Sequence, residues 1–201
     1  MHEQKNLLLV FYKNPEPGKV KTRLAATVGN KIAVQVYQKL VTHTASLLKN
    51  LDATVHVYYA DEIRTHDVWP DSSITKKIQF EGNLGLKMNH AFKESLVEGF
   101  EKVCIIGTDC LELTTSIIQK AFDLLNKNDF VIGPAKDGGY YLLGMKKLEF
   151  SLFENKNWST HTVLHDTLFD ILRLKKTYAL LPLLSDVDVE EDLPKDFLQN
   201  L

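Results

Sequence analysis

The stretch Asn6–Leu24, NLLLVFYKNPEPGKVKTRL, decides the fold class. Its first seven residues are almost continuously apolar, which is typical of a parallel strand covered by helices on both faces. The chain then becomes polar, with two prolines, a glycine and three cations after that glycine. A second run, Lys102–Gly107 (KVCIIG), is apolar in the same continuous way. The two runs predict central strands of a mostly parallel sheet.

Other short apolar runs alternate with helix-length segments in a βαβ-like order. Helical spacing of apolar residues predicts a helix over Lys31–Leu48, and a second over Trp158–Arg173 with Ser159 or Thr160 as its N-cap. Between them, DFVIGPA, DGG and YYLLGMK predict two strands joined by a glycine-dependent bend. We therefore expect an α/β, single-domain, Rossmann-like fold, with a mostly parallel central sheet flanked by helices on both faces.

Length and composition limit the function classes. The 201 residues, 44% of them hydrophobic, predict one domain over residues 1–201. A net charge of -2 argues against binding a nucleic-acid polymer. The N-terminus has only a short apolar run and no signal-peptide pattern, so we expect no membrane association and a cytoplasmic location. Cys104 and Cys110 are expected to be small core residues.

The cations Lys19, Lys21 and Arg23 follow the first predicted strand. Doubly wound sheets bind ligands beyond the carboxyl ends of their strands, so these side chains are placed to neutralise a di- or triphosphate. Gly18 would permit close backbone approach. The segment is not a Walker A loop, because Lys13 stands where that motif requires glycine and no Ser or Thr follows Lys19. A solvated basic loop is the alternative.

Carboxylates follow two later apolar runs. Asp109 comes directly after KVCIIG, where a Mg²⁺ ligand would lie, although it could equally cap the following helix or turn. Asp186 and Asp188 follow another apolar run and could give the same ion a second carboxylate. Asp188 with Glu191 also fits a capping box, so both interpretations stay open.

Glycine-containing bends provide further candidates. Asp137 precedes Gly138 and Gly139, and either forms an ordinary turn or orients a substrate hydroxyl or a metal-bound water. The segment containing Gly82, Gly85 and Lys87 could hold a base or ribose, or be a plain strand-to-helix connection. His161 and His165 have a metal-binding spacing but no third ligand nearby, so surface or core positions are favoured.

Six blocks, taken in order, carry a resemblance to a known family: FYKNPEPGKVKTRLA, EGNLGLKM, CIIGTDCLEL, VIGPAKDGGYYLLGM, NWSTHTVLHDT and DVDVEEDL. Together they resemble the GT-A-type glycosyltransferase family associated with arsenosugar biosynthesis or with radical-SAM and selenium gene clusters. That family is similar in fold to nucleotide-diphospho-sugar transferases and, more distantly, to the molybdenum-cofactor and 2-phospholactate guanylyltransferases. The resemblance covers nearly the whole chain and implies a nucleotide ligand.

The resemblance also implies roles for individual residues. It places Lys19, Lys21 and Arg23 on the phosphates of the nucleotide. Asp109 would bind Mg²⁺ or Mn²⁺, with the late aspartate Asp188 near the same metal. The bend from Asp137 to Tyr140 would lie beside the transferred group. One departure is that the sequence Thr108–Cys110 does not form a full DxD metal motif.

The expected function is a metal-dependent transferase with a nucleoside-phosphate donor. The first choice is glycosyl transfer from a nucleotide sugar to a small-molecule acceptor, with Asp137 positioning or deprotonating the acceptor. The alternative is nucleotidyl transfer, in which an acceptor attacks the α-phosphorus of a nucleoside triphosphate and pyrophosphate leaves. A third hypothesis is a nucleotide-binding module without turnover.

Overall fold

The computed structural model describes residues 5–201, so the first four residues of the predicted domain lie outside it. The central sheet has seven strands in the order β3-β2-β1-β4-β6-β5-β7. The two strands predicted from continuous apolar runs, β1 and β4, lie side by side at its centre. The strands are β1 (Asn6–Tyr12), β2 (Thr54–Tyr59), β3 (Thr75–Ile78), β4 (Lys102–Ile106), β5 (Phe130–Pro134), β6 (Tyr140–Met145) and β7 (Tyr178–Leu180).

Most neighbouring strands run parallel. Strand β1 pairs in parallel with β2 and β4, β2 with β3, and β5 with β7. Strand β6 is antiparallel to both of its neighbours, because the bend Asp137–Gly139 sends the chain directly back beside β5. The predicted mostly parallel sheet and the predicted hairpin are both confirmed.

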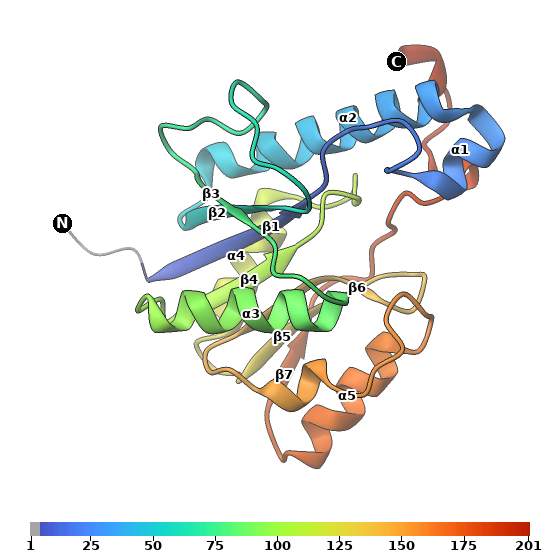
Figure 1. Cartoon of the computed structure of the whole chain (residues 1–201). Coiled ribbons are helices and arrows are strands. Elements are labelled where there is room, and N and C mark those ends of the chain that lie inside the picture. Colours follow the sequence, from blue (N-terminus) through green and yellow to red (C-terminus); the bar gives the residue numbers. More distant parts are fainter. Residues whose placement is uncertain (1–4) are drawn as a thin grey trace.

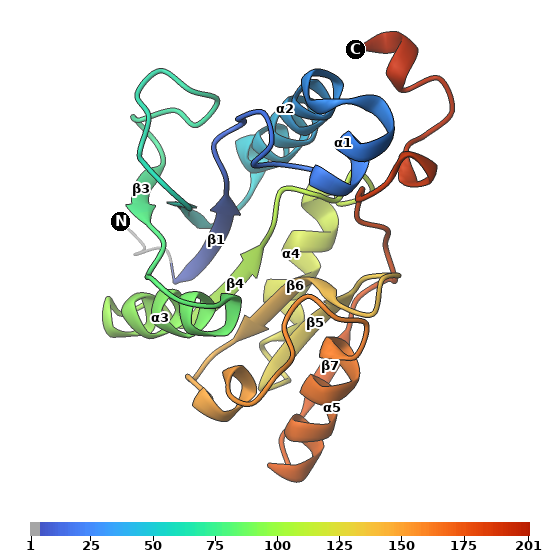
Figure 2. The ribbon, with the colours of Figure 1, turned by 45° about the vertical axis from the view of Figure 1, so that its right-hand side comes forward.

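Helices cover both faces of the sheet, as predicted (Figures 1 and 2). On one face, Leu8 and Val10 of β1 belong to a core cluster with side chains of α2 and α4. On the other face, Leu7 and Leu9 pack with side chains of α3, α5 and the 3-10 helix η2. The helices are α1 (Thr22–Val28), α2 (Asn30–Leu47), α3 (Leu84–Val97), α4 (Thr115–Leu124) and α5 (Val163–Arg173), with 3-10 turns η1 (Leu48–Asn50), η2 (Phe150–Phe153), η3 (Glu190–Asp192) and η4 (Leu198–Asn200).

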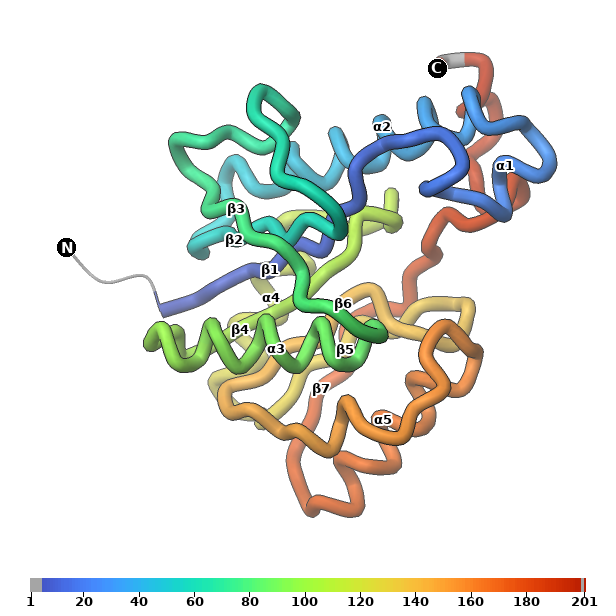
Figure 3. Tube along the Cα trace, in the orientation of Figure 1, coloured from blue at the N-terminus to red at the C-terminus, as the bar shows by residue number. Residues whose placement is uncertain are grey.

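The chain after β7 returns across the end of the sheet to α1 and α2 (Figure 3). The backbone N–H of Val187 donates to the carbonyl of Asp109, with an N···O distance of 2.9 Å. Val187 is buried in a cluster with Leu24 of α1 and with α2, and Phe197 packs against the same cluster. This segment therefore carries Asp186 and Asp188 to the loop that follows β4.

The predicted loop after β1 is shorter than expected, because Thr22–Val28 forms the helix α1. Leu24 is fully buried against α2 and gives this short helix its apolar contact. The residue before the helix, Lys21, has left-handed backbone angles (φ 48°, ψ 46°). Arg23 consequently lies on the first turn of a helix rather than in a loop.

One predicted cap was wrong, and two caps that the sequence leaves open as alternatives are not formed. Helix α5 begins at Val163 instead of near Trp158, and Ser159 lies in the preceding turn with a positive φ of 63°. Helix α4 is capped by Thr114, so Asp109 is not its cap. Near the C-terminus, the Asp192 carboxylate accepts hydrogen bonds from the backbone N–H groups of Asp188 and Val189, at 2.8 and 3.0 Å, in place of the Asp188–Glu191 capping box.

The structure also bears on the cysteines and on membrane-spanning helices. Cys104 and Cys110 are buried free cysteines, which confirms them as core residues. Among the described residues, no helix is both long enough and apolar enough to cross a membrane.

Candidate functional site

A cavity of about 680 Å³ opens at the carboxyl ends of β1 and β4, where the sequence predicted the site. This volume is within the range of small-molecule pockets. Its walls come from the loops after β1 and β4, the bend between β5 and β6, the segment before α5 and the segment after β7. Among the predicted residues, the cations Lys19, Lys21, Arg23 and Lys87 line it, as do the carboxylates Asp109, Asp137 and Asp188.

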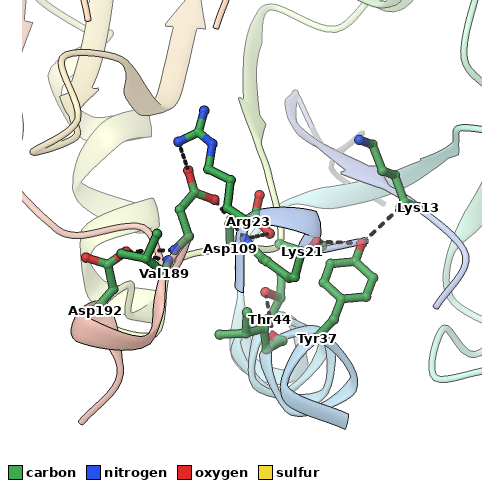
Figure 4. Close-up of polar contacts among 11 residues, drawn as sticks. Lys13, Lys21, Arg23, Tyr37, Thr44, Asp109, Val189 and Asp192 are labelled. Atoms are coloured by element: carbon green, nitrogen blue, oxygen red, sulfur yellow. Dashed lines mark hydrogen bonds and ion pairs between the residues drawn. The ribbon is translucent and has the colours of Figure 1, made fainter. Parts of the chain in front are cut away.

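Lys21 lies at the centre of the charged part of this cavity (Figure 4). Its Nζ is 2.8 Å from Oδ1 of Asp109 and 3.3 Å from Oδ1 of Asp188, and its side chain is only 5% exposed. Burial alone would lower the pKa of Lys21, but the charges of Asp109 and Asp188 more than offset this effect and hold it above its usual value. Lys21 is therefore a buried, fully charged ammonium shared by two carboxylates.

The other two predicted phosphate ligands differ from Lys21. Arg23 approaches the second oxygen of Asp188, with an Nη1–Oδ2 distance of 3.3 Å, while its side chain stays 66% exposed. Lys19 pairs with Glu16 at 2.7 Å and is also mostly exposed. The three cations thus divide into two that face Asp188 and one that is held at the rim by Glu16.

Tyr37 joins the loops after β1 and β4 and was not found from the sequence. Its hydroxyl accepts a hydrogen bond from the backbone N–H of Lys13 at 3.1 Å (Figure 4). The same hydroxyl is 3.0 Å from Oγ1 of Thr108, next to Asp109. Burial raises the pKa of Tyr37, so the hydroxyl stays protonated. Tyr37 lies on the buried face of α2, and nothing in its local sequence distinguishes it from an ordinary core residue.

Asp186 is the carboxyl group with the most perturbed environment in the cavity. Burial, followed by the charges of Asp109 and Asp137, raises the pKa of Asp186 to about 7, although Lys21 opposes the shift. Four carboxylates, the fourth being Asp188, thus line the cavity, and Lys21 and Arg23 contact two of them, Asp109 and Asp188. Neither cation forms an ion pair with Asp137 or Asp186, so this part of the cavity has carboxylate oxygens left for an additional cation.

Asp137 forms the predicted turn and also lies at the cavity. Its Oδ1 accepts a hydrogen bond from the backbone N–H of Gly139 at 2.8 Å, as in an ordinary turn, and its side chain still lines the cavity. Gly139 and Tyr140 line the cavity, whereas Gly138 does not. A Cβ at Gly138 would lie 2.1 Å from the carbonyl oxygen of His161, so this glycine admits the segment before α5 rather than a ligand.

Gly82 and Gly85 are also explained by contacts within the chain. Gly82 has a positive φ of 127° and precedes Asn83, whose side chain accepts a hydrogen bond from Leu86 N and caps α3. A Cβ at Gly85 would lie 2.5 Å from Nε1 of Trp158. Neither glycine lines the cavity, whereas Trp158 does. The requirement for glycine at position 85 comes from the indole packed on α3, which local sequence does not reveal.

The oxygen donors of Asp109 and Asp188 suit a hard divalent cation such as Mg²⁺ or Mn²⁺. Within residues 5–201, no group of three or more His, Cys, Asp and Glu side chains is arranged to hold a metal ion. That is consistent with magnesium sites that use one or two carboxylates and complete their coordination with water and substrate phosphates. His165 is exposed beside Asp166 and outside the cavity.

Comparison with known proteins places this geometry in a family. The sequence profile of a family described as an uncharacterized protein conserved in bacteria, DUF2064, matches residues 43–160, more than half of the chain. The chain belongs to the DUF2064 family. No curated protein sequence matches this DUF2064 chain.

Solved structures extend the comparison. A crystal structure from Desulfovibrio desulfuricans, described as a "putative nucleotide-diphospho-sugar transferase", is 32% identical with a TM-score of 0.87, covering 93% of this chain and 84% of that one. The inositol-1-phosphate CTP transferase of T. maritima is 16% identical with a TM-score of 0.58, over 99% and 96% of the two chains. A 4-diphosphocytidyl-2C-methyl-D-erythritol synthase from Anaerococcus prevotii is 14% identical with a TM-score of 0.58, over 94% and 92%.

The low identities of the last two proteins show only a shared fold. All three structures confirm the predicted fold class. The match at 32% identity supports the predicted superfamily of nucleotide-diphospho-sugar transferases. None of these matches concerns arsenosugar biosynthesis or radical-SAM gene clusters.

Proposed function

We propose that this DUF2064 chain is a transferase that binds a nucleoside-phosphate donor together with Mg²⁺ or Mn²⁺, and that it transfers a glycosyl group to a small acceptor. The observation that carries the proposal is the buried Lys21 ammonium between Asp109 and Asp188, within a cavity that four carboxylates line. A polyphosphate alone would be repelled by the carboxylates, and a cation alone would leave Lys21 and Arg23 without an anionic ligand. The site fits the two together.

Asp109 and Asp188 would hold the divalent ion, which supplies positive charge to the phosphate oxygens of the donor. Lys21 and Arg23 would stabilise the same phosphates as negative charge builds up on the leaving group. Lys19 at the rim would attract the donor as it enters. Asp137, on the opposite wall, would face the acceptor.

In the proposed glycosyl transfer, one bond forms and one bond breaks at the anomeric carbon. The oxygen of an acceptor hydroxyl forms a bond to the anomeric carbon of the donor sugar. The bond from that carbon to the phosphate oxygen breaks, and its electron pair leaves with the nucleoside diphosphate. Asp137 takes the hydroxyl proton or directs it to water. The relative at 32% identity supports this choice, because a nucleotide-diphospho-sugar transferase uses this kind of donor.

Nucleotidyl transfer is the second candidate. In this reaction, an acceptor oxygen attacks the α-phosphorus of a nucleoside triphosphate, and pyrophosphate leaves. The observation that favours it is the origin of the carboxylates, since Asp109 follows β4 and Asp188 follows β7 instead of forming one DxD motif. The structures that share the fold include CTP-dependent transferases. The third hypothesis, a binding module without turnover, does not account for four carboxylates around a phosphate site.

Product analysis by phosphorus NMR tests the proposal. The protein is incubated with nucleotide sugars or nucleoside triphosphates, Mg²⁺ or Mn²⁺, and a panel of hydroxyl- and phosphate-bearing acceptors. A nucleoside diphosphate and a sugar conjugate mean glycosyl transfer, whereas pyrophosphate means nucleotidyl transfer. Asp109→Asn is the inactive control. Tight nucleotide binding with no product from any acceptor would replace the proposed activity with the binding-module hypothesis.

A further inference from the structure

We infer that Lys21 is an exchangeable counter-ion: its ammonium occupies the Asp109–Asp188 carboxylates when no metal is bound, and leaves them for the donor phosphates when a divalent ion arrives. This inference rests on the proposed function and goes beyond it. It makes Lys21 the residue that couples metal binding to nucleotide binding.

The lysine and a divalent ion would compete for the space between the same two carboxylates. The Nζ of Lys21 contacts Oδ1 of Asp109 at 2.8 Å and Oδ1 of Asp188 at 3.3 Å, so it lies where an ion bridging those side chains would lie. An ammonium and a metal ion repel each other and cannot share these positions. One of them must therefore be absent when the other is bound.

The charges of the two possible counter-ions differ. The ammonium of Lys21 brings one positive charge to two carboxylates, Asp109 and Asp188. A divalent ion adds twice the charge of the ammonium. If Lys21 left without a replacement, two neighbouring, partly buried carboxylates would lose the counter-charge between them, which is unfavourable. The lysine is therefore held in place until a cation of higher charge replaces it.

The backbone of Lys21 is also unusual. Left-handed angles are uncommon for a residue with a side chain, and such residues concentrate at functional sites. As the residue before α1, Lys21 also makes no side-chain hydrogen bond that would cap the helix. In this conformation the Lys21 side chain is 5% exposed and its ammonium lies between the two carboxylates. These ion pairs offset the backbone strain, and a bound metal ion would remove them.

The released ammonium stays inside the same cavity. Lysine has a flexible four-carbon stem, so its Nζ can turn to a phosphate without a backbone shift. Arg23, which contacts the other oxygen of Asp188, has the same opportunity. Metal binding thus frees the side chains of Lys21 and Arg23 to bind the donor phosphates and increases the affinity for the donor. By linkage, the donor must increase the affinity for the metal by the same factor.

The first test is the affinity for Mn²⁺ without any nucleotide, measured from the electron paramagnetic resonance signal of the free ion. We expect Lys21→Met to bind Mn²⁺ at least about tenfold more tightly than the wild type, because the competing ammonium is gone, a change equivalent to about 1.4 kcal/mol. Lys19→Met is the matched control, since it removes the same charge from the same loop but pairs with Glu16. It should leave the affinity nearly unchanged.

Equal or weaker Mn²⁺ binding by folded Lys21→Met would overturn the inference while leaving the proposed function intact. If the wild type binds no Mn²⁺ even with nucleotides present, the metal dependence of the proposed function fails and the inference fails with it. Activity is measured separately on the wild type, so the two failures are distinguishable.

A second measurement needs no folded Lys21→Met. The ammonium resonances of ¹⁵N-labelled lysines are recorded in the wild type, and the Lys21 signal is assigned from its loss in Lys21→Arg. Saturating Mg²⁺ should shift or broaden this signal while leaving that of the buried lysine Lys156, which pairs with Asp170 at 2.6 Å, unchanged. An unchanged Lys21 signal at saturating Mg²⁺ would contradict the displacement.

Discussion

Lys21 and Lys76 each form ion pairs with two aspartates, but the further contacts of those aspartates differ. The Nζ of Lys76 on β3 is 3.0 Å from Oδ1 of Asp67 and 2.6 Å from Oδ1 of Asp71, and its side chain is 8% exposed. Lys21 likewise lies between two aspartates and is 5% exposed. Each group therefore consists of one buried lysine and two aspartates.

The difference lies in what else the carboxylates contact. Asp67 also accepts hydrogen bonds from the hydroxyl of Tyr59 and from the backbone N–H of Trp69, and its side chain is 14% exposed. Asp109 is 43% exposed and opens into the cavity. Asp71, the second partner of Lys76, is 58% exposed but does not line the cavity. The Lys76 group therefore holds the segment before β3, whereas both carboxylates of the Lys21 group line the cavity and are open to a ligand. A buried ion pair marks a candidate functional site where its oxygens are accessible from a cavity.

The largest expected difference is in activity. Asp109→Asn should lower kcat/KM by about 10²–10³-fold, the usual cost of removing one group that stabilises developing charge. Stability should change little, because Lys21 keeps Asp188 as its partner. Steady-state product formation and urea unfolding measure the two effects. Normal turnover by this variant would show that Asp109 does not hold the metal.

The second difference is in stability. Asp67→Asn should cost about 2–3 kcal/mol of unfolding free energy, because a carboxylate that serves Lys76, Tyr59 and Trp69 is replaced by a neutral amide. Its kcat/KM should stay within a few-fold of the wild type. Urea unfolding provides the measurement. A loss of activity as large as that of Asp109→Asn, with stability intact, would remove the distinction between the two groups.

The third difference depends on pH. Burial and neighbouring carboxylates raise the pKa of Asp186 to about 7, against about 3.9 in an unfolded chain. Between these values the folded protein holds a proton that the unfolded chain has lost, so Asp186 lowers stability progressively as pH rises from about 4 to 7. With a chelator present, Asp186→Asn should therefore raise Tm at pH 8 by about 2–6 °C and less at pH 5.

Thermal unfolding of the Asp186→Asn variant and the wild type at the two pH values checks this sign. A matched gain at both pH values would mean that the variant acts through packing instead of charge. A lower Tm at pH 8 would mean that the carboxylate is stabilising, contrary to its position among other carboxylates.

The smallest effect is expected at the rim of the cavity. Arg64 pairs with Glu16, which in turn holds Lys19, so Arg64 joins the Lys76 segment to the loop after β1. Arg64→Gln should raise the KM for the donor by roughly two- to threefold with kcat unchanged, as suits an exposed ion pair. Glu62→Gln removes only the other partner of Arg64 and should leave KM unchanged. Equal effects of both changes would argue against this linkage.

Much of the fold followed from periodicity. Continuous apolar runs located β1 and β4, and the glycine-containing bend located the antiparallel hairpin. Helix α1 could not be found in this way, because it is seven residues long and depends on burying Leu24 against α2 and the C-terminal segment. Its start is also fixed by the left-handed backbone at Lys21, which no propensity favours for lysine.

The sequence predicted where the site lies better than it predicted which side chains contact one another there. The rule that ligands bind beyond the carboxyl ends of the strands led to Lys21, Asp109 and Asp137, which all line the cavity. The ion pair between Lys21 and Asp188 joins residues 167 positions apart and depends on where the chain crosses after β7. The reasons for Gly85 and Gly138 are likewise tertiary, since Trp158 and the backbone of His161 approach them.

Thermal unfolding of the wild type and of Asp109→Asn is the most direct test of a metal-dependent nucleotide site. Nucleotide sugars and nucleoside triphosphates are added in the presence of Mg²⁺, Mn²⁺ or a chelator. A ligand that binds the folded protein raises its apparent stability by mass action. We expect one nucleotide to raise the Tm of the wild type only when a divalent ion is present, and we expect Asp109→Asn to lose this increase. An equal increase in chelator, or none with any nucleotide, would contradict a metal-dependent nucleotide site.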